Sequence, residues 1–203
     1  MEENVDFLSG NDVIEGLYEK NTGERGAVIT HPHPLYGGDM HNDVVKTITR
    51  AYRNKRYATL RFNFRGVGAS QGAFDNGVGE QEDVFAAVAF LKDKGIRAID
   101  LAGYSFGVSV NIRAIGKAFV AEHIERMVMV SPPVGFIDVN RVRPISKRIW
   151  VITGSRDQIA VLRSIEKLLA QWNPEAQLSV IEGADHFYSG YMDQLESILD
   201  THL

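Results

Sequence analysis

The stretch that decides the fold reads AIDLAGYSFG and spans residues 98–107. Its first five residues are mostly apolar, as in a buried strand, and residues 108–120 have a helical pattern. Between them, two glycines flank Ser105 at the apex of a sharp turn. Such a strand–turn–helix unit exposes the serine Oγ and points the backbone N–H of the next residue, Phe106, at the same place. A Gly-x-Ser-x-Gly string also arises by chance, so its place between a strand and a helix carries the prediction of a reactive serine.

Composition narrows the class of protein. The 203 residues, 44% of them hydrophobic, suffice for one substantial core, so we expect a single domain over residues 1–203. The net charge of −4 does not favour nucleic-acid binding, and the absence of cysteine excludes disulfides, thiolate metal sites and a cysteine nucleophile. The acidic N-terminus has no signal-peptide pattern, and no apolar run reaches the ~18 residues of a membrane span. We expect a cytoplasmic protein that binds no membrane and needs no cofactor.

Strand and helix patterns alternate along the rest of the chain. Two short strands around Gly10-Asn11-Asp12 predict an antiparallel hairpin, and the later alternation indicates a mostly parallel sheet covered on both faces. The expected class is therefore an α/β three-layer sandwich with the hairpin at the sheet edge. The strands are expected at residues 5–9, 13–18, 27–30, 57–64, 98–102, 126–131, 149–153 and 178–181. The helices are expected at residues 39–54, 80–94, 108–120, 159–172 and 188–202.

Polar residues follow several of these strands, at the sheet edge where ligands of α/β proteins collect. Ser105, Asp157 and His186 occur in the chain order in which this architecture supplies nucleophile, acid and base. A serine hydroxyl needs a base to take its proton, and the base needs an acid to fix its tautomer. His186 follows the last strand in a loop that can place its ring over Ser105, so we interpret it as the base. Of the other histidines, His123 and His202 lie in or beside expected helices, and His41 opens a helix that it could cap. His31 and His33 follow a strand but precede the serine, which does not fit the usual chain order.

The choice of the acid rests on position. Asp157 stands at a strand end, where its carboxylate can reach a histidine on the adjacent strand, although it could instead cap the following helix. Asp185 adjoins His186 in sequence, which turns its side chain away from the ring's outer nitrogen. Glu182 and Asp138 are weaker rivals. We therefore favour Asp157 as the acid.

A reactive serine also needs hydrogen-bond donors for the negative charge that develops on its substrate. The N–H of Phe106 is one such donor. The second is expected from the loop at residues 31–38, because the backbone there follows a neighbouring strand. The prolines of this loop have no N–H to donate, which leaves His33 or Leu35 to complete the oxyanion hole.

Two other patterns predict less. The glycine-rich loop at residues 65–72 lacks the lysine of a phosphate-binding P-loop and is followed by a further loop instead of a helix. The histidines at 31, 33 and 41 could converge on a metal, but no carboxylate is placed clearly beside them. We expect no metal site.

With these residues assembled, the chain resembles the α/β-hydrolase superfamily, specifically the small capless bacterial hydrolases related to dienelactone hydrolase and the carboxylesterase-like members. The resemblance implies a Ser105–His186–Asp157 catalytic triad, cleavage of an ester-like bond through an acyl-enzyme, and His33 as the second oxyanion donor. Dienelactone hydrolases use cysteine, which this chain lacks, and the acid loop DQIA at residues 157–160 lacks the Val-Pro that often follows the acid. The stretches that carry the likeness are residues 31–38, 61–70, 103–107, 157 and 183–187.

The expected substrate is a small molecule with an ester or thioester bond. Residues 134–148, where many relatives insert a lid, are predicted to form only a connector, which leaves an open, shallow site. A serine peptidase or amidase on the same triad is one alternative, and a binding protein with a vestigial site is another; a strained serine turn argues against the second. The oligomeric state stays open. The side chains expected to line the site are those of Tyr36, Tyr104, Phe106, Val134 and Phe187.

Overall fold

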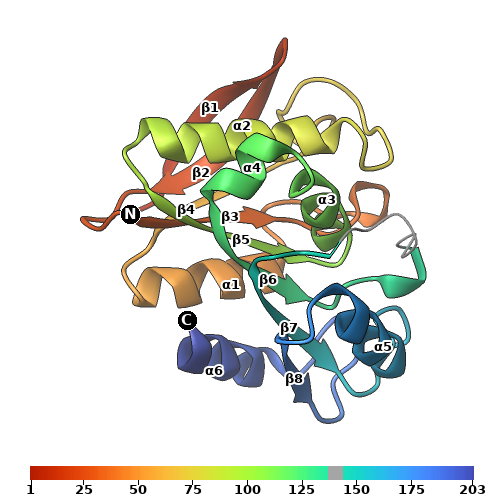
Figure 1. Ribbon diagram of the computed structural model, residues 1–203. Helices are drawn as coiled ribbons and strands as arrows, with labels where there is room; N and C mark the ends of the chain where they lie inside the picture. The colour runs from red at the N-terminus through yellow and green to blue at the C-terminus, as the bar shows by residue number, and fades with distance from the viewer. Residues whose placement is uncertain (137–143) are drawn as a thin grey trace.

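A computed structural model describes residues 1–136 and 144–203 (Figure 1). These residues form an eight-stranded sheet in the order β1-β2-β4-β3-β5-β6-β7-β8. Strands β3 to β8 run parallel to one another, whereas β1 and β2 form an antiparallel hairpin whose second strand pairs antiparallel with β4. The predicted hairpin at the sheet edge is therefore confirmed. The strands are β1 (Glu3–Ser9), β2 (Asp12–Glu19), β3 (Arg25–Thr30), β4 (Ala58–Phe62), β5 (Ala98–Tyr104), β6 (Ile124–Val130), β7 (Arg148–Gly154) and β8 (Gln177–Ile181).

Helices cover both faces of this sheet, which confirms the predicted three-layer α/β class (Figure 1). Helices α1 and α6 pack side by side on one face, and the other four lie on the opposite face. In each parallel strand the side chains alternate between the two faces: in β5, Leu101 packs with the second group of helices and Ala102 with the first. The helices are α1 (Asp43–Asn54), α2 (Glu80–Asp93), α3 (Phe106–Ala114), α4 (Ala118–His123), α5 (Leu162–Trp172) and α6 (Met192–His202).

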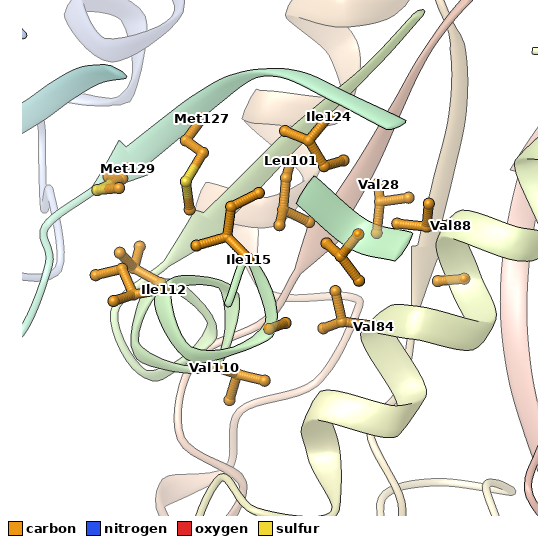
Figure 2. Close-up of a cluster of buried hydrophobic side chains, with 14 of the residues drawn as sticks. Val28, Val84, Val88, Leu101, Val110, Ile112, Ile115, Ile124, Met127 and Met129 are labelled. Atoms are coloured by element: carbon orange, nitrogen blue, oxygen red, sulfur yellow. The ribbon is translucent and has the colours of Figure 1, made fainter. Parts of the chain in front are cut away.

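The larger apolar cluster lies between the sheet and helices α2 and α3. Figure 2 shows aliphatic side chains of the central strands meeting those of the two helices, with Leu101 of β5 and Met127 of β6 facing Ile112 and Val84. Because β5 is central and buried on both faces, its position and the start of the following helix are fixed by this packing. The cluster thus holds in place the two elements, β5 and α3, that flank the turn at Ser105.

The helices expected from residues 39 and 188 begin later than predicted, because a side-chain cap delays one and the backbone conformation delays the other. The helix expected from residue 39 begins at Asp43, since the Asn42 carboxamide accepts the N–H of Val44 at 3.0 Å and so caps it. His41 is therefore not the cap. The helix expected from residue 188 begins at Met192, because Tyr188 and Gly190 have positive φ angles of 56° and 79°.

The helix predicted at residues 108–120 is divided in two. Helix α3 already begins at Phe106, directly after the serine, and ends at Ala114, and α4 follows after the turn around Gly116. Glycine in a helix interior favours such an interruption. The helix predicted from residue 159 begins only at Leu162, because the N–H groups of Ile159 and Ala160 are bound by a side chain before it. Among the described residues, no helix combines the length and apolar character that crossing a bilayer requires.

Close packing of α3 against the end of β3 predicts that Gly107 cannot be replaced without cost. A Cβ at Gly107 would lie 2.5 Å from Thr30 Oγ1 and 2.8 Å from His31 O. Gly107→Ala should lower the free energy of unfolding in urea by about 1–3 kcal/mol. Gly23→Ala is the matched control, since its nearest neighbour would be Arg56 O at 3.8 Å. Equal stability of the two variants would contradict this packing.

Candidate active site

Ser105 occupies a strained turn between β5 and α3. Its backbone has φ 53° and ψ −117°, in a region that costs a residue other than glycine about 1–3 kcal/mol. The strand ends one residue before it and the helix begins one residue after it, so the side chain projects from the apex. Gly103 makes this tight turn possible, because a Cβ there would lie 2.5 Å from Thr30 Oγ1 and 2.7 Å from Asn111 Nδ2. The predicted strand–turn–helix unit is confirmed.

Three loops at the carboxyl edge of the sheet bring Ser105, His186 and Asp157 together. The serine Oγ lies 3.0 Å from His186 Nε2, and His186 Nδ1 lies 2.8 Å from Asp157 Oδ2 and 3.0 Å from Asp157 Oδ1. An ionised carboxylate only accepts, so Nδ1 carries the ring proton and Nε2 is left to accept the serine hydroxyl proton. All three residues are buried to more than nine-tenths, with residual exposures of 8% for Ser105, 6% for His186 and 5% for Asp157.

Asp157 is held by donors from three directions. Its Oδ1 accepts the N–H groups of Ile159 at 2.9 Å and Ala160 at 2.7 Å, and its Oδ2 accepts the hydroxyl of Ser131 at 2.7 Å. Burial raises the pKa of this carboxyl, but hydrogen bonds from His186, Ala160 and Ser131 outweigh burial and hold the pKa below its usual value. The carboxylate therefore remains ionised at neutral pH. It organises the turn before α5 without capping that helix.

Ser131 and Tyr188 are site residues that the sequence analysis did not identify. Ser131 donates its proton to Asp157, so the Tyr188 hydroxyl, 2.8 Å away, supplies the donor to Ser131 Oγ. Tyr188 is fully buried and its hydroxyl also lies 3.3 Å from Ile152 O. The position of Ser131 in the sequence could have identified it. Ser131 directly follows β6, which lies in the sheet between β5, the strand before Ser105, and β7, the strand before Asp157.

Tyr104 does not line the site as predicted. It is only 3% exposed and belongs to the apolar cluster under α1 and α6. Its hydroxyl donates to the backbone oxygen of His186 at 2.8 Å, and the two ring centroids are 5.5 Å apart. Tyr104 therefore supports the histidine from behind. The prediction failed because the side chain before the serine alternates to the buried face of the strand.

The loop after β3 folds over the start of α3. The ring centroids of His33 and Phe106 are 4.8 Å apart, so the side chains of the two residues expected to supply the oxyanion donors pack against each other. The N–H of Leu35 donates to His33 Nδ1 at 3.2 Å, so the structure removes Leu35 from the candidates. Within the described part of the chain, the N–H groups of His33 and Phe106 have no hydrogen-bond acceptor. Phe106 is also the first residue of α3, where the helix dipole favours negative charge.

Apolar side chains surround this edge of the sheet on the loops that follow β3, β4, β7 and β8. Two of the predicted lining residues belong to them: Tyr36 is 88% exposed and Phe187 is 65% exposed. Phe106 is half-buried, and Val134 is buried in the cluster that includes α3 and α5. Two hollows of about 420 and 630 Å³ lie at the opposite edge, among charged residues. The exposed apolar side chains at the carboxyl edge are Leu35, Tyr36, Val78, Ile159, Val161 and Phe187.

The rival assignments fit the structure less well. Asp185 accepts the N–H groups of Phe187 at 3.0 Å and Ser189 at 3.4 Å within its own loop, and Asp138 lies outside the described residues. The glycine-rich loop at residues 65–72 is no phosphate cradle, because the Glu15 carboxylate accepts the N–H of Ala69 at 2.7 Å and would repel an anion. His31 offers no nitrogen to a metal, since both ring nitrogens bond to the backbone.

Comparison with known proteins places this geometry in a family. No protein-family model matches the chain. The uncharacterized protein RP471 of Rickettsia prowazekii is 33% identical over 202 residues, which cover 94% of this chain and 84% of that protein. An α/β serine hydrolase homologue from Coxiella burnetii is 30% identical and superposes with a TM-score of 0.91 over 99% of this chain and 97% of its own.

A second solved structure carries the same likeness. XC6422 from Xanthomonas campestris, described as an α/β serine hydrolase without a lid, is 29% identical with a TM-score of 0.87 over 98% of this chain and 93% of its own. The described residues between β6 and β7 likewise contain only a short 3-10 turn, Val134–Phe136, at the place where a lid would be inserted. The chain therefore belongs to the α/β-hydrolase superfamily, as a small hydrolase without a lid.

Proposed function

We propose that this protein is a serine hydrolase that cleaves small carboxylic esters or thioesters through an acyl-enzyme on Ser105. One observation carries the proposal: a strained serine at a strand–helix turn begins an unbroken hydrogen-bonded chain to His186 and Asp157. A protein that only binds ligands has no physical need for such a strained residue. The serine hydrolase descriptions of the Coxiella and Xanthomonas structures support the same reading.

In the proposed acylation step, His186 Nε2 takes the proton of Ser105 as Oγ attacks the ester carbonyl carbon. Asp157 stabilises the imidazolium that forms and keeps its ring oriented. The negative charge on the carbonyl oxygen is stabilised by the N–H groups of Phe106 and His33. The imidazolium then protonates the leaving alcohol or thiol, which departs as the carbonyl reforms. In deacylation His186 activates a water molecule by the same route, and the acid is released.

The supports of the triad explain how it stays poised. The Tyr188 and Ser131 hydroxyls form a buried relay of donors that ends on Asp157, and Tyr104 fixes the backbone of His186. Tyr188 donates to Ser131 and Ser131 donates to Asp157, which stays ionised and accepts the Nδ1–H of His186. His186 Nε2 is therefore free to accept the proton of Ser105. Hydrogen bonds of this kind preorganise the base before the substrate arrives.

The substrate is proposed to be small, and its acyl or alcohol group to lie against exposed apolar side chains. Tyr36 and Phe187 offer such surfaces on opposite loops, and the half-buried ring of Phe106 adjoins the serine. Val134 stays a further candidate. We expect an open site, in which a long acyl chain would gain no enclosed tunnel, so chain length should add little binding energy.

Replacement of Ser105 or His186 by alanine should abolish both fluorophosphonate labelling and turnover of a short activated ester. Removal of a triad member lowers kcat by about 10⁴-fold or more, because the nucleophile is lost or no longer activated. Ser164→Ala, on the exposed side of α5, is the matched control and should label and turn over like the native protein. Persistent labelling of Ser105→Ala would refute the assignment of the nucleophile. A matched anilide separates esterase from amidase activity.

Asp157→Asn should lower kcat by about 10⁴-fold and also change the acid stability. The folded pKa of Asp157 lies below the usual 3.8, so its stabilising contribution is complete above the unfolded pKa of about 3.9 and is lost as the pH falls through the folded value. The free energies of unfolding of native and variant protein should therefore differ by a constant amount from about pH 7 to 5. That difference should shrink below about pH 4. A difference that grows on acidification would contradict the lowered pKa.

Specificity can be tested with a series of p-nitrophenyl esters from acetate to dodecanoate. We expect kcat/KM to be greatest for the short chains and to stay level or fall as the chain lengthens, because the described residues form no lid between β6 and β7. Tyr36→Ala and Phe187→Ala should raise KM by a few-fold and leave kcat nearly unchanged. A steep rise of kcat/KM with chain length would contradict the open site.

A further inference from the structure

His31 is a buried polar residue that the mechanism described above does not use. It directly follows β3, is 0% exposed, and its ring packs against that of Phe64 with the centroids 4.7 Å apart. Its Nε2 lies 3.0 Å from the backbone nitrogen of Phe64, and its Nδ1 lies 2.7 Å from the backbone oxygen of Pro32. A backbone N–H can only donate, so Nε2 accepts and the proton of the neutral ring is on Nδ1. The ring therefore donates to the Pro32 carbonyl.

The Pro32 carbonyl and the His33 N–H belong to one peptide unit. Among the described residues no peptide bond is cis, so the carbonyl and the N–H of this unit point in opposite directions. A donor that fixes the carbonyl consequently fixes the direction of the His33 N–H. A hydrogen bond to a peptide oxygen also polarises the unit and makes its N–H a stronger donor.

The same peptide is also confined by Gly38. A Cβ at Gly38 would lie 2.2 Å from Pro32 O, and the N–H groups of Gly38 and Tyr36 both donate to His33 O at 3.1 Å. The loop is thus folded tightly on itself around His33. The contact of His31 links the Pro32 carbonyl to the core through Phe64, two residues after β4.

We propose that His31 is a positioning residue of the oxyanion hole: its Nδ1–H holds the Pro32–His33 peptide so that the His33 N–H faces the oxyanion formed at Ser105. This inference rests on the proposed serine hydrolase function. Burial lowers the pKa of His31 to about 4, so the ring stays neutral and keeps this hydrogen-bond pattern at neutral pH.

Two substitutions separate the two bonds of the ring. In His31→Asn, the amide nitrogen takes the place of Nδ1 and can donate to the Pro32 carbonyl, but nothing reaches the Phe64 N–H. In His31→Gln, the amide lies one bond farther out, where its oxygen can accept from Phe64 and the donor to Pro32 is lost. We expect kcat/KM to fall by about 10- to 100-fold in His31→Gln, less than on removal of a whole oxyanion donor, and to stay within about fivefold of the native value in His31→Asn.

A transition-state analogue distinguishes positioning from mere stability. A trifluoromethyl ketone forms a hemiketal oxyanion on the serine, whereas the matched methyl ketone binds without one. In His31→Gln, affinity for the trifluoromethyl ketone should fall in parallel with kcat/KM and affinity for the methyl ketone should not change. Rates are expressed per active site, counted by complete fluorophosphonate titration, so a partly unfolded variant does not distort them.

The outcomes that overturn the inference are distinct from those that overturn the proposed function. Equal losses in the two variants, or an unchanged preference of His31→Gln for the trifluoromethyl ketone, would make His31 a structural residue only, while Ser105-dependent turnover of the native protein persists. Absence of that turnover would overturn the hydrolase proposal and this inference together. Nitrogen-15 NMR of the native protein needs no variant to fold: it should show His31 protonated on Nδ1 only, and protonation on Nε2 would refute the assignment.

Discussion

The structure depends on the close approach of the turn at Ser105 to the end of β3. Gly103 and Gly107 leave no room for a side chain, because a Cβ on either residue would lie 2.5 Å from Thr30 Oγ1. This contact has two consequences. It holds Ser105 in a strained backbone conformation that points its hydroxyl at His186, and it packs the loop after β3 against the first turn of α3. The proposed nucleophile and the two proposed oxyanion donors are thus positioned by one constraint.

A second constraint is electrostatic. Asp157 is a buried carboxylate, which is costly unless donors surround it, and here the N–H groups of Ile159 and Ala160, the Ser131 hydroxyl and the His186 ring do so. The bonds from Ile159 and Ala160 shape the loop before α5, and the carboxylate fixes the tautomer of His186 by accepting its Nδ1–H. His31 is a second buried polar group whose hydrogen bonds are complete. Its neutral ring bonds to the Pro32 carbonyl in the loop after β3 and to the Phe64 N–H just after β4. Buried polar groups with complete hydrogen bonding therefore frame the serine on both sides.

The strands, and the convergence of Ser105, Asp157 and His186 at one edge of the sheet, could be predicted from the sequence. Apolar runs, glycines and strand ends are local signals that short stretches of sequence contain. The starts of α1 and α5 were misplaced, because the side chains of Asn42 and Asp157 bind backbone N–H groups that a helix would otherwise use. Tyr104 was wrongly predicted to line the substrate site. The sequence does not show which face of the sheet its side chain occupies, because this depends on how β5 is placed in the folded sheet. The relay from Tyr188 through Ser131 joins residues far apart in the chain, and the choice between His33 and Leu35 depended on one side-chain contact. These features arise only from tertiary packing.

The central claim is that catalysis passes through an acyl group on Ser105. The most direct measurement is mass spectrometry of the protein quenched in acid within milliseconds of mixing with a short-chain p-nitrophenyl ester, followed by peptide mapping. The account predicts an added mass equal to the acyl group on the peptide that contains Ser105, formed in a burst with p-nitrophenol and absent from His186→Ala. Turnover without acylation, or acylation at a different residue, would contradict it.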